Sequence, residues 1–113
     1  MTHEMKLQEK YYNYIQNGTK RIELRLYDDK RKQIKIGDTI IFYKEPELVE
    51  SFRGKVIDLL IENSFEELFK HYDIDILADK TMTKKELLKD LETFYTTEKQ
   101  QKYGVLGIIV ELI

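Results

Sequence analysis

The residues best suited to chemistry gather in one short stretch, GTKRIELRLYDDKR at positions 18–31. Lys20, Glu23 and Arg25 stand there among alternating hydrophobic residues. The planar guanidinium of arginine suits a phosphate or the edge of a base. A carboxylate can orient a water molecule as a general base, or accept hydrogen bonds from an amino group. The stretch is therefore the first candidate for a binding or catalytic site.

The same stretch is also compatible with an ordinary solvated strand. If the hydrophobic residues of 22–26 face the core, then Arg21, Glu23 and Arg25 share the opposite face. Charge pairs across strands on such a face stabilise a sheet by at most ~1 kcal/mol each. Charge is nevertheless unevenly spread, because positions 20–35 carry a local balance of +4 in a chain of net charge −2. The pattern alone leaves both interpretations open.

Composition limits the classes of protein that the chain can belong to. Its 113 residues predict one domain over positions 1–113, and 42% hydrophobic residues are enough for a folded core. Without cysteine, disulfides and thiolate metal sites are excluded. The two histidines, His3 and His71, lack ligand spacing, so we expect no metal. No glycine-rich phosphate loop precedes a helix, so no nucleotide cofactor is indicated.

The same sequence gives no sign of a membrane protein. The opening MTHEMKLQEK has no apolar run like that of a signal peptide. The longest apolar runs are far too short to span a bilayer. We therefore expect a cytoplasmic protein with no membrane partner.

The first half of the chain predicts one helix followed by three strands. Hydrophobic spacing in LQEKYYNYIQNG, residues 7–18, predicts a helix that ends at a glycine. Alternation over 20–26 predicts a strand with one buried face. The turn Gly37–Asp38 leads into a buried strand around 40–43. The run at 53–62 is a further strand candidate, although its hydrophobicity alone does not exclude a helix.

The second half predicts helices and a closing strand. Ser64 and Thr83 each precede a glutamate by three residues, the capping-box pattern that starts a helix. Thr97 is expected to open a short helical turn. The β-branched segment 104–113 predicts a core strand, where Gly107 marks a close backbone approach or a bulge.

This order predicts an α+β fold. Short links between the early strands favour a mostly antiparallel sheet. A small curved sheet or partly closed barrel with peripheral helices fits the order, and an open sheet covered by helices remains an alternative.

At these motifs the chain resembles the ASCH domain, the activating signal cointegrator homology domain of the PUA-like superfamily. GTKRIELR fits the family signature Gly-x-Lys-x-x-Glu-x-Arg, and IKIGDTIIF resembles its Gly-Asp turn and buried strand. HEMKL, LYDDKR, SFEELF and KYGVLGIIVEL resemble further family motifs in the right order, so the similarity spans nearly the whole chain.

The resemblance implies a small, mostly antiparallel β-barrel with peripheral helices and a cleft beside the signature. The superfamily's common theme is recognition of RNA or of modified nucleosides. Lys20, Glu23 and Arg25 would line the cleft. Neighbouring motifs add, less directly, a first-strand histidine, a basic pair in a loop and a tyrosine, namely His3, Lys30, Arg31 and Tyr103.

One branch of the family is enzymatic and deacetylates acetylcytidine. It uses the signature lysine as base, a threonine three residues later as nucleophile and a glutamate from the second half of the chain. Here Lys20 is present, Glu23 occupies the threonine position, and the second-half glutamate aligns near Asp79 and Lys80. The chain thus follows the glutamate version of the motif. We expect an RNA, nucleotide or nucleoside ligand, with an amidohydrolase that uses Lys20 and Glu23 as the alternative.

Overall fold

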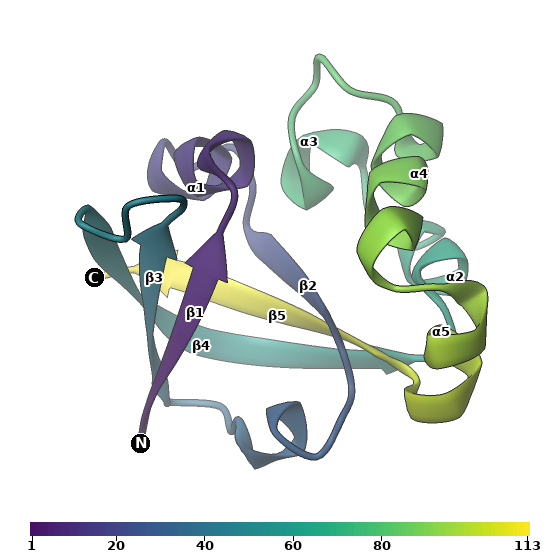
Figure 1. Cartoon of the computed structure of the whole chain (residues 1–113), viewed down its shortest axis with the longest axis horizontal. Helices are drawn as coiled ribbons and strands as arrows, with labels where there is room; N and C mark the ends of the chain where they lie inside the picture. The colour runs from purple at the N-terminus through teal and green to yellow at the C-terminus, as the bar shows by residue number, and fades with distance from the viewer.

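One five-stranded sheet organises the chain (Figure 1). The structure is a computed structural model that describes residues 1–113. The sheet and the helices around it form an α+β fold, as the sequence predicted. In chain order the elements are β1 (Thr2–Leu7), α1 (Glu9–Gln16), β2 (Ile22–Leu26), the 3-10 turn η1 (Arg31–Gln33), β3 (Thr39–Lys44), β4 (Ser51–Glu62), α2 (Phe65–Phe69), α3 (Ile74–Leu77), α4 (Lys84–Phe94), α5 (Thr97–Tyr103) and β5 (Val105–Leu112).

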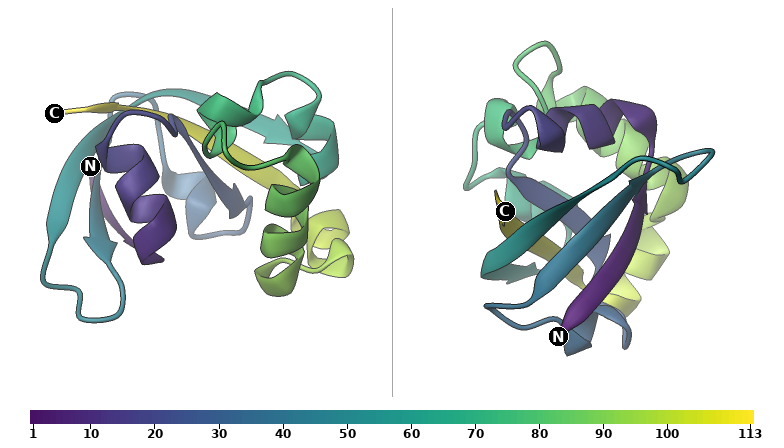
Figure 2. Two further views of the ribbon diagram at one scale, coloured as in Figure 1. Left: turned by 90° about the horizontal axis from the view of Figure 1, so that it is seen from above. Right: turned by 90° about the vertical axis from the view of Figure 1, so that its left-hand side faces the viewer.

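The sheet is curled into a half-barrel, which Figure 2 shows from two sides. Its strand order is β1-β3-β4-β5-β2. The three pairings β3–β4, β4–β5 and β2–β5 are antiparallel, which confirms the mostly antiparallel sheet, whereas β1 and β3 run parallel. The long strand β4 pairs with both of its neighbours and carries a register irregularity between Val56 and Asp58. An irregularity of this kind bends a strand, and here it accompanies the curl that brings β1 and β2 near each other.

The helix predicted over residues 7–18 begins later than predicted, because strand β1 precedes it. Leu7 is the last residue of β1, and α1 begins only at Glu9. The strand is short and lies at an edge, and only Met5 and Leu7 of its residues are buried. Two buried residues give too weak an alternation to stand out in the sequence, although the family resemblance did imply a first strand.

The helix starts follow local capping. The hydroxyl of Ser64 accepts a hydrogen bond from the Glu67 N–H, and the full capping box forms at Thr83, as predicted. Helix α5 begins at Thr97, as predicted, and the preceding Thr96 is its cap and accepts from the Lys99 N–H at 3.2 Å. Both threonines can cap a helix, and the backbone leaves the extended conformation after the first of them.

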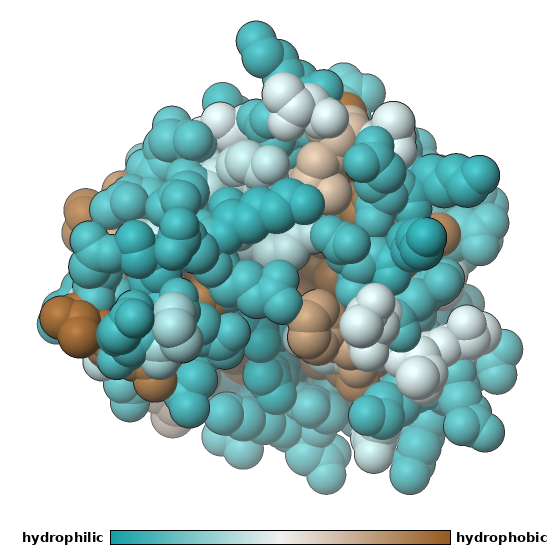
Figure 3. Space-filling view, turned by 45° about the horizontal axis from the view of Figure 1, so that its top comes forward, coloured by the Kyte–Doolittle hydropathy of each residue, from teal (hydrophilic) through white to brown (hydrophobic).

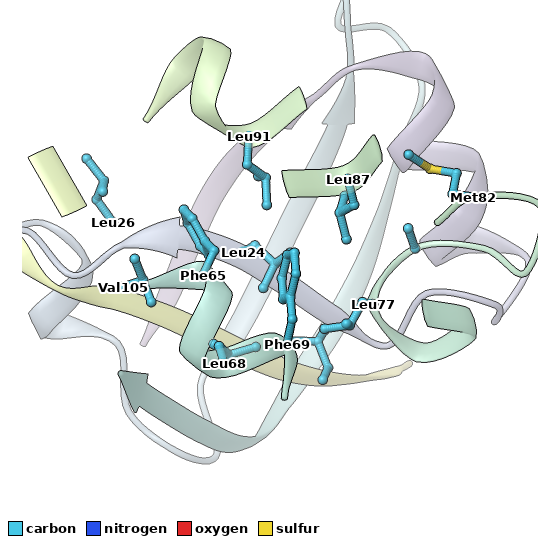
Figure 4. Close-up of a cluster of buried hydrophobic side chains, with 12 residues drawn as sticks. Leu24, Leu26, Phe65, Leu68, Phe69, Leu77, Met82, Leu87, Leu91 and Val105 are labelled. Atoms are coloured by element: carbon cyan, nitrogen blue, oxygen red, sulfur yellow. The ribbon is translucent and has the colours of Figure 1, made fainter. Parts of the chain in front are cut away.

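Strand β2 is buried on both faces, which its alternating pattern did not predict. Ile22, Leu24 and Leu26 pack against α2 and α4 in one hydrophobic cluster (Figure 4). Glu23 and Arg25 lie opposite Ile108 and Leu106 of β5, which belong to a second cluster inside the curl of the sheet. Residues paired in this way share a face. Glu23 and Arg25 therefore point into the half-barrel rather than out to solvent.

At Gly107, where the sequence predicted a close backbone approach or a bulge, it is side chains of α2 and β2 that approach closely. A Cβ atom at this position would lie 3.0 Å from Leu68 Cδ1 and 3.1 Å from Ile22 Cγ2. The absence of a side chain at Gly107 therefore lets α2 pack directly on β5.

None of the helices combines the length and the apolar character that crossing a membrane requires.

Candidate ligand-binding cleft

A cavity of about 160 Å³ lies where the edge strands β1 and β2 face each other. We call it the inner cavity. Its polar side is formed by Lys20, Glu23 and Arg25, the signature residues. The opposite wall is apolar and aromatic, and comes from α1 and from α4 with the residue after it: Tyr11, Leu87, Leu91, Phe94 and Tyr95. On the face shown in Figure 3, a narrow strip of more hydrophobic residues separates two hydrophilic areas.

Lys20 is a buried cation at this cavity, with only 2% of its surface exposed. Its ammonium group donates to the Leu77 carbonyl at 2.5 Å, lies 4.0 Å from Glu23 Oε1 and stands 5.7 Å from the centre of the Tyr11 ring. Burial lowers the pKa of Lys20 to about 8, although the Glu23 carboxylate opposes this shift. Because an ammonium group has three donors, Lys20 has hydrogen-bonding capacity left for a ligand.

The backbone around Lys20 is fixed by hydrogen bonds to neighbouring elements. The Lys20 N–H donates to the Tyr14 carbonyl at 2.9 Å, and the Arg21 N–H donates to the Ile76 carbonyl at 2.8 Å. These bonds join the start of β2 to α1 and α3. These bonds fix the backbone at Lys20 before β2 begins, and they thereby set the direction of its side chain. The alternating pattern of residues 20–26 did not predict this direction.

Glu23 is held in one orientation by its neighbours. Its Oε1 atom accepts from the Leu24 N–H at 3.1 Å. Its Oε2 atom accepts from Arg25 Nε at 3.1 Å and from Arg25 Nη2 at 2.9 Å. Both oxygens are thus engaged, and the two bonds from Arg25 are charge-assisted and therefore stronger than neutral ones. The carboxylate is suited to orienting Arg25 and to presenting its remaining lone pairs to the cavity.

Arg25 links the two edges of the sheet. Its Nη2 atom donates to the Lys6 carbonyl of β1 at 2.9 Å. Burial by itself would lower the pKa of Arg25, but the Glu23 carboxylate, together with Tyr95, outweighs burial and raises that pKa. Arg25 therefore remains a cation between β1 and β2.

A second, larger cavity of about 600 Å³ adjoins the first, and we call it the outer groove. Lys6, Arg25 and Glu45 line both spaces, so Arg25 stands at their junction. Lys30 and Arg31, the basic pair expected at the cleft, line the outer groove and not the inner cavity.

The remaining residues expected from the sequence lie elsewhere. His3 Nε2 is 2.8 Å from Asp38 Oδ2, beside the turn before β3. Tyr103 ends α5, is 39% exposed and has Lys102 over its ring. The Asp79 carboxylate accepts hydrogen bonds from the Thr81 N–H and hydroxyl. None of His3, Tyr103 and Asp79 lines the inner cavity or the outer groove.

Sequence reasoning missed the aromatic wall. Tyr11 falls within the helix predicted over residues 7–18, but nothing in the sequence indicates that it meets Phe94 and Tyr95, at the end of α4, beside the signature. Tyr11 donates to Asp90 Oδ2 at 2.7 Å, which connects α1 to α4. The abundance of tyrosine was a weak signal, since tyrosine favours half-buried positions.

The structure contains no group of three or more histidine or acidic side chains that could hold a metal ion.

Comparisons with known proteins agree with this architecture. The sequence model of the ASCH domain matches residues 5–113. The crystal structure of the hypothetical protein PH0355 is 40% identical, with a TM-score of 0.87 and complete coverage of both chains. The solution NMR structure of protein PF0455 from Pyrococcus furiosus is 34% identical, with a TM-score of 0.76, and covers 100% of this chain and 98% of that one. No curated protein matches the sequence.

A more distant structure shares the fold. The S128A mutant of ZmASCH from Zymomonas mobilis is 9% identical, with a TM-score of 0.68, over 96% of this chain and 66% of that one. At such low identity the likeness concerns the fold alone. The match over residues 5–113, with the two relatives above 30% identity, shows that the chain belongs to the ASCH domain family.

Proposed function

We propose that this protein binds single-stranded RNA or a nucleotide, and holds one base in the inner cavity. The observation that carries the proposal is the cluster of buried Lys20 and Glu23 with the partly exposed Arg25, which faces an aromatic wall. Buried charges are costly for a fold unless they are paired or have a role, and here they surround a space open to a ligand.

The chemistry of the cavity suits a nucleobase. A base offers carbonyl oxygens that Lys20 can bind as a donor, and an amino group that Glu23 can bind as an acceptor. Phe94, which is 52% exposed, and Tyr95 offer aromatic faces or edges for the ring. RNA-binding proteins recognise single-stranded bases by this combination of stacking and edge contacts.

The size of the cavity favours one ring system rather than a whole nucleotide. Its volume of about 160 Å³ is smaller than the roughly 300–1,000 Å³ of pockets for drug-sized ligands. A ligand larger than a base must therefore extend out of the inner cavity.

A titration with short unstructured RNAs at two salt concentrations tests the proposal. We expect binding that weakens as salt increases, because phosphate contacts release counterions. Arg25→Ala should abolish binding. Arg21→Ala is the matched control, since Arg21 lies in the same stretch but is exposed and lines neither cavity. Absence of binding at low salt, or unchanged binding in Arg25→Ala, would overturn the proposal.

The lowered pKa of Lys20, about 8, favours a second candidate, an amidohydrolase acting on an acylated nucleoside such as acetylcytidine. A lysine with such a pKa is partly neutral near physiological pH and can accept a proton. Glu23, held by Arg25 and the Leu24 N–H, is poorly placed for nucleophilic attack, so a water molecule would have to attack. Incubation with acetylcytidine and chromatographic detection of cytidine tests this function. No turnover, or full turnover in Lys20→Met, would exclude it.

A further inference from the structure

The inner cavity and the outer groove form one continuous recess that turns around Arg25. The two spaces share Lys6, Arg25 and Glu45 in their linings. They differ in character, because the wall of the smaller inner cavity is largely apolar and the larger outer groove is lined mainly by charged residues. A ligand with a flat apolar part and a charged part would match the apolar inner cavity and the charged outer groove next to it.

Basic residues outnumber acidic residues, four to two, in the lining of the outer groove. Arg25 pairs with Glu23, and Arg31 pairs with Asp28 at 3.3 Å through Nη1. Lys6 and Lys30, which also line the groove, are left without an ion-pair partner. Two acids, Glu4 and Glu45, line the groove as well, and Glu4 keeps its charge while it accepts a hydrogen bond from the Tyr43 hydroxyl, whose pKa this bond raises.

Arg31 supplies an independent sign of a missing partner. Its Nε atom is buried and makes no hydrogen bond, although the same side chain is oriented by its contact with Asp28. A buried donor without an acceptor is costly in a native structure. The Arg31 side chain as a whole is 21% exposed and lines the outer groove, and a phosphate group matches its guanidinium fork.

We infer that the outer groove is a phosphate subsite, so that the ligand of this protein is a phosphorylated nucleotide and not a free nucleoside. This inference rests on the proposed function, in which the base occupies the inner cavity. Arg31 and Lys30 bind the phosphate, and Arg25 lies between base and phosphate.

Nucleosides and nucleotides compared side by side test the inference. The four ribonucleosides, their 5′- and 3′-monophosphates and inorganic phosphate are titrated into the isotopically labelled protein and followed by NMR. At least one monophosphate should bind about tenfold tighter than its nucleoside, as expected for charge-assisted hydrogen bonds. Inorganic phosphate alone should bind weakly and shift the resonances around the outer groove only.

Substitutions test which residues are responsible for the higher affinity of the monophosphate. Lys30→Gln/Arg31→Gln should remove the advantage of the monophosphate and leave nucleoside affinity unchanged. Arg31→Lys, which keeps the charge but removes Nε, should lose part of the advantage. Lys55→Gln/Lys99→Gln is the matched control, because it removes equal charge from exposed positions outside both spaces and should keep the full advantage.

The outcomes separate this inference from the proposed function. Nucleosides that bind in the inner cavity as tightly as their monophosphates would overturn the phosphate subsite and leave the proposed function standing. If Lys30→Gln/Arg31→Gln still bound the monophosphate more tightly than the nucleoside, this result would likewise overturn the phosphate subsite alone. No binding of any nucleoside, nucleotide or RNA would overturn both. Phosphate-dependent binding that Leu91→Phe, a change in the inner cavity, does not alter would overturn the base site alone.

Discussion

Arg25 on one edge strand of the curled sheet donates a hydrogen bond from Nη2 to the Lys6 carbonyl on the other edge strand, at 2.9 Å. The bond crosses the opening of the half-barrel, where no backbone ladder joins β1 to β2. Arg25 thus has two roles, since it links the strands beside the inner cavity and also lines the surface that a ligand would contact.

Removal of the Arg25 guanidinium should destabilise the protein by about 3 kcal/mol, because the buried Glu23 would lose its hydrogen-bonded partner and keep only the Lys20 ammonium, 4.0 Å away. Denaturant unfolding of Arg25→Met measures this loss. The double variant Glu23→Gln/Arg25→Met should recover part of the stability, since the buried carboxylate is no longer charged, although Lys20 then lacks its ion-pair partner. It should not recover RNA binding. Equal losses of stability in the single and double variants would contradict the pairing.

The low pKa of Lys20 predicts a specific pH dependence. Below pH 8 both the folded and the unfolded protein hold the proton on Lys20, and the cost of burying this charge is fully present. Between pH 8 and the ordinary lysine value of 10.5, only the unfolded state keeps the proton, so this group makes the free energy of unfolding rise with pH. Lys20→Met should lack this rise when unfolding is measured at pH 7, 8, 9 and 10.

Ligand affinity should change in the opposite direction over the same range. A charged Lys20 donates to the ligand in the proposed function, so RNA or nucleotide affinity should fall as the pH passes 8. Lys20→Met should bind weakly at every pH and show no such step. An affinity that is constant from pH 7 to 9 in the unsubstituted protein would show that Lys20 does not contact the ligand as a cation.

Tyr11→Phe should loosen the contact between α1 and α4. The lost hydrogen bond to Asp90, 2.7 Å long, should cost about 1 kcal/mol of stability. Tyr14→Phe is the matched control on the same helix, because the Tyr14 ring packs edge to face on Tyr11 while its hydroxyl takes no part in this bond. Thermal unfolding of both variants provides the comparison, and similar losses in both would contradict a specific role for the bond.

His3→Ala should lower stability without changing RNA or nucleotide binding, because His3 bonds to Asp38 outside both cavities. The hydrogen bond from His3, together with the Lys35 N–H, lowers the pKa of Asp38 to about 2. The stabilisation is therefore complete above the ordinary aspartate value of 3.8 and is lost as the pH falls toward 2.

Acid unfolding should therefore show His3→Ala approaching the unsubstituted protein in stability at the lowest pH values. His71→Ala, at an exposed histidine, is the control and should change neither stability nor binding. Loss of ligand affinity in His3→Ala would instead support the role in the cleft that the family resemblance implied for this residue.

The sequence by itself determined most of the elements and the identity of the signature. Alternation marked β2, local capping patterns placed the starts of α2 and α4, and the β-branched run marked β5. Each of these features depends on residues close together in the chain, which is why a local pattern can reveal them. The mostly antiparallel arrangement followed from short connections for the same reason.

Only the tertiary structure decided what surrounds the signature. Lys20 bonds to the carbonyl of Leu77, 57 residues away, and Arg25 bonds to that of Lys6, 19 residues away. Both contacts exist because the sheet curls and α3 and α4 pack against its outer face, so a strand that alternates like a surface strand is buried on both sides. Periodicity records which residues share a face, but it does not record what covers that face. No local sequence pattern could therefore predict the inner cavity, its aromatic wall or the outer groove.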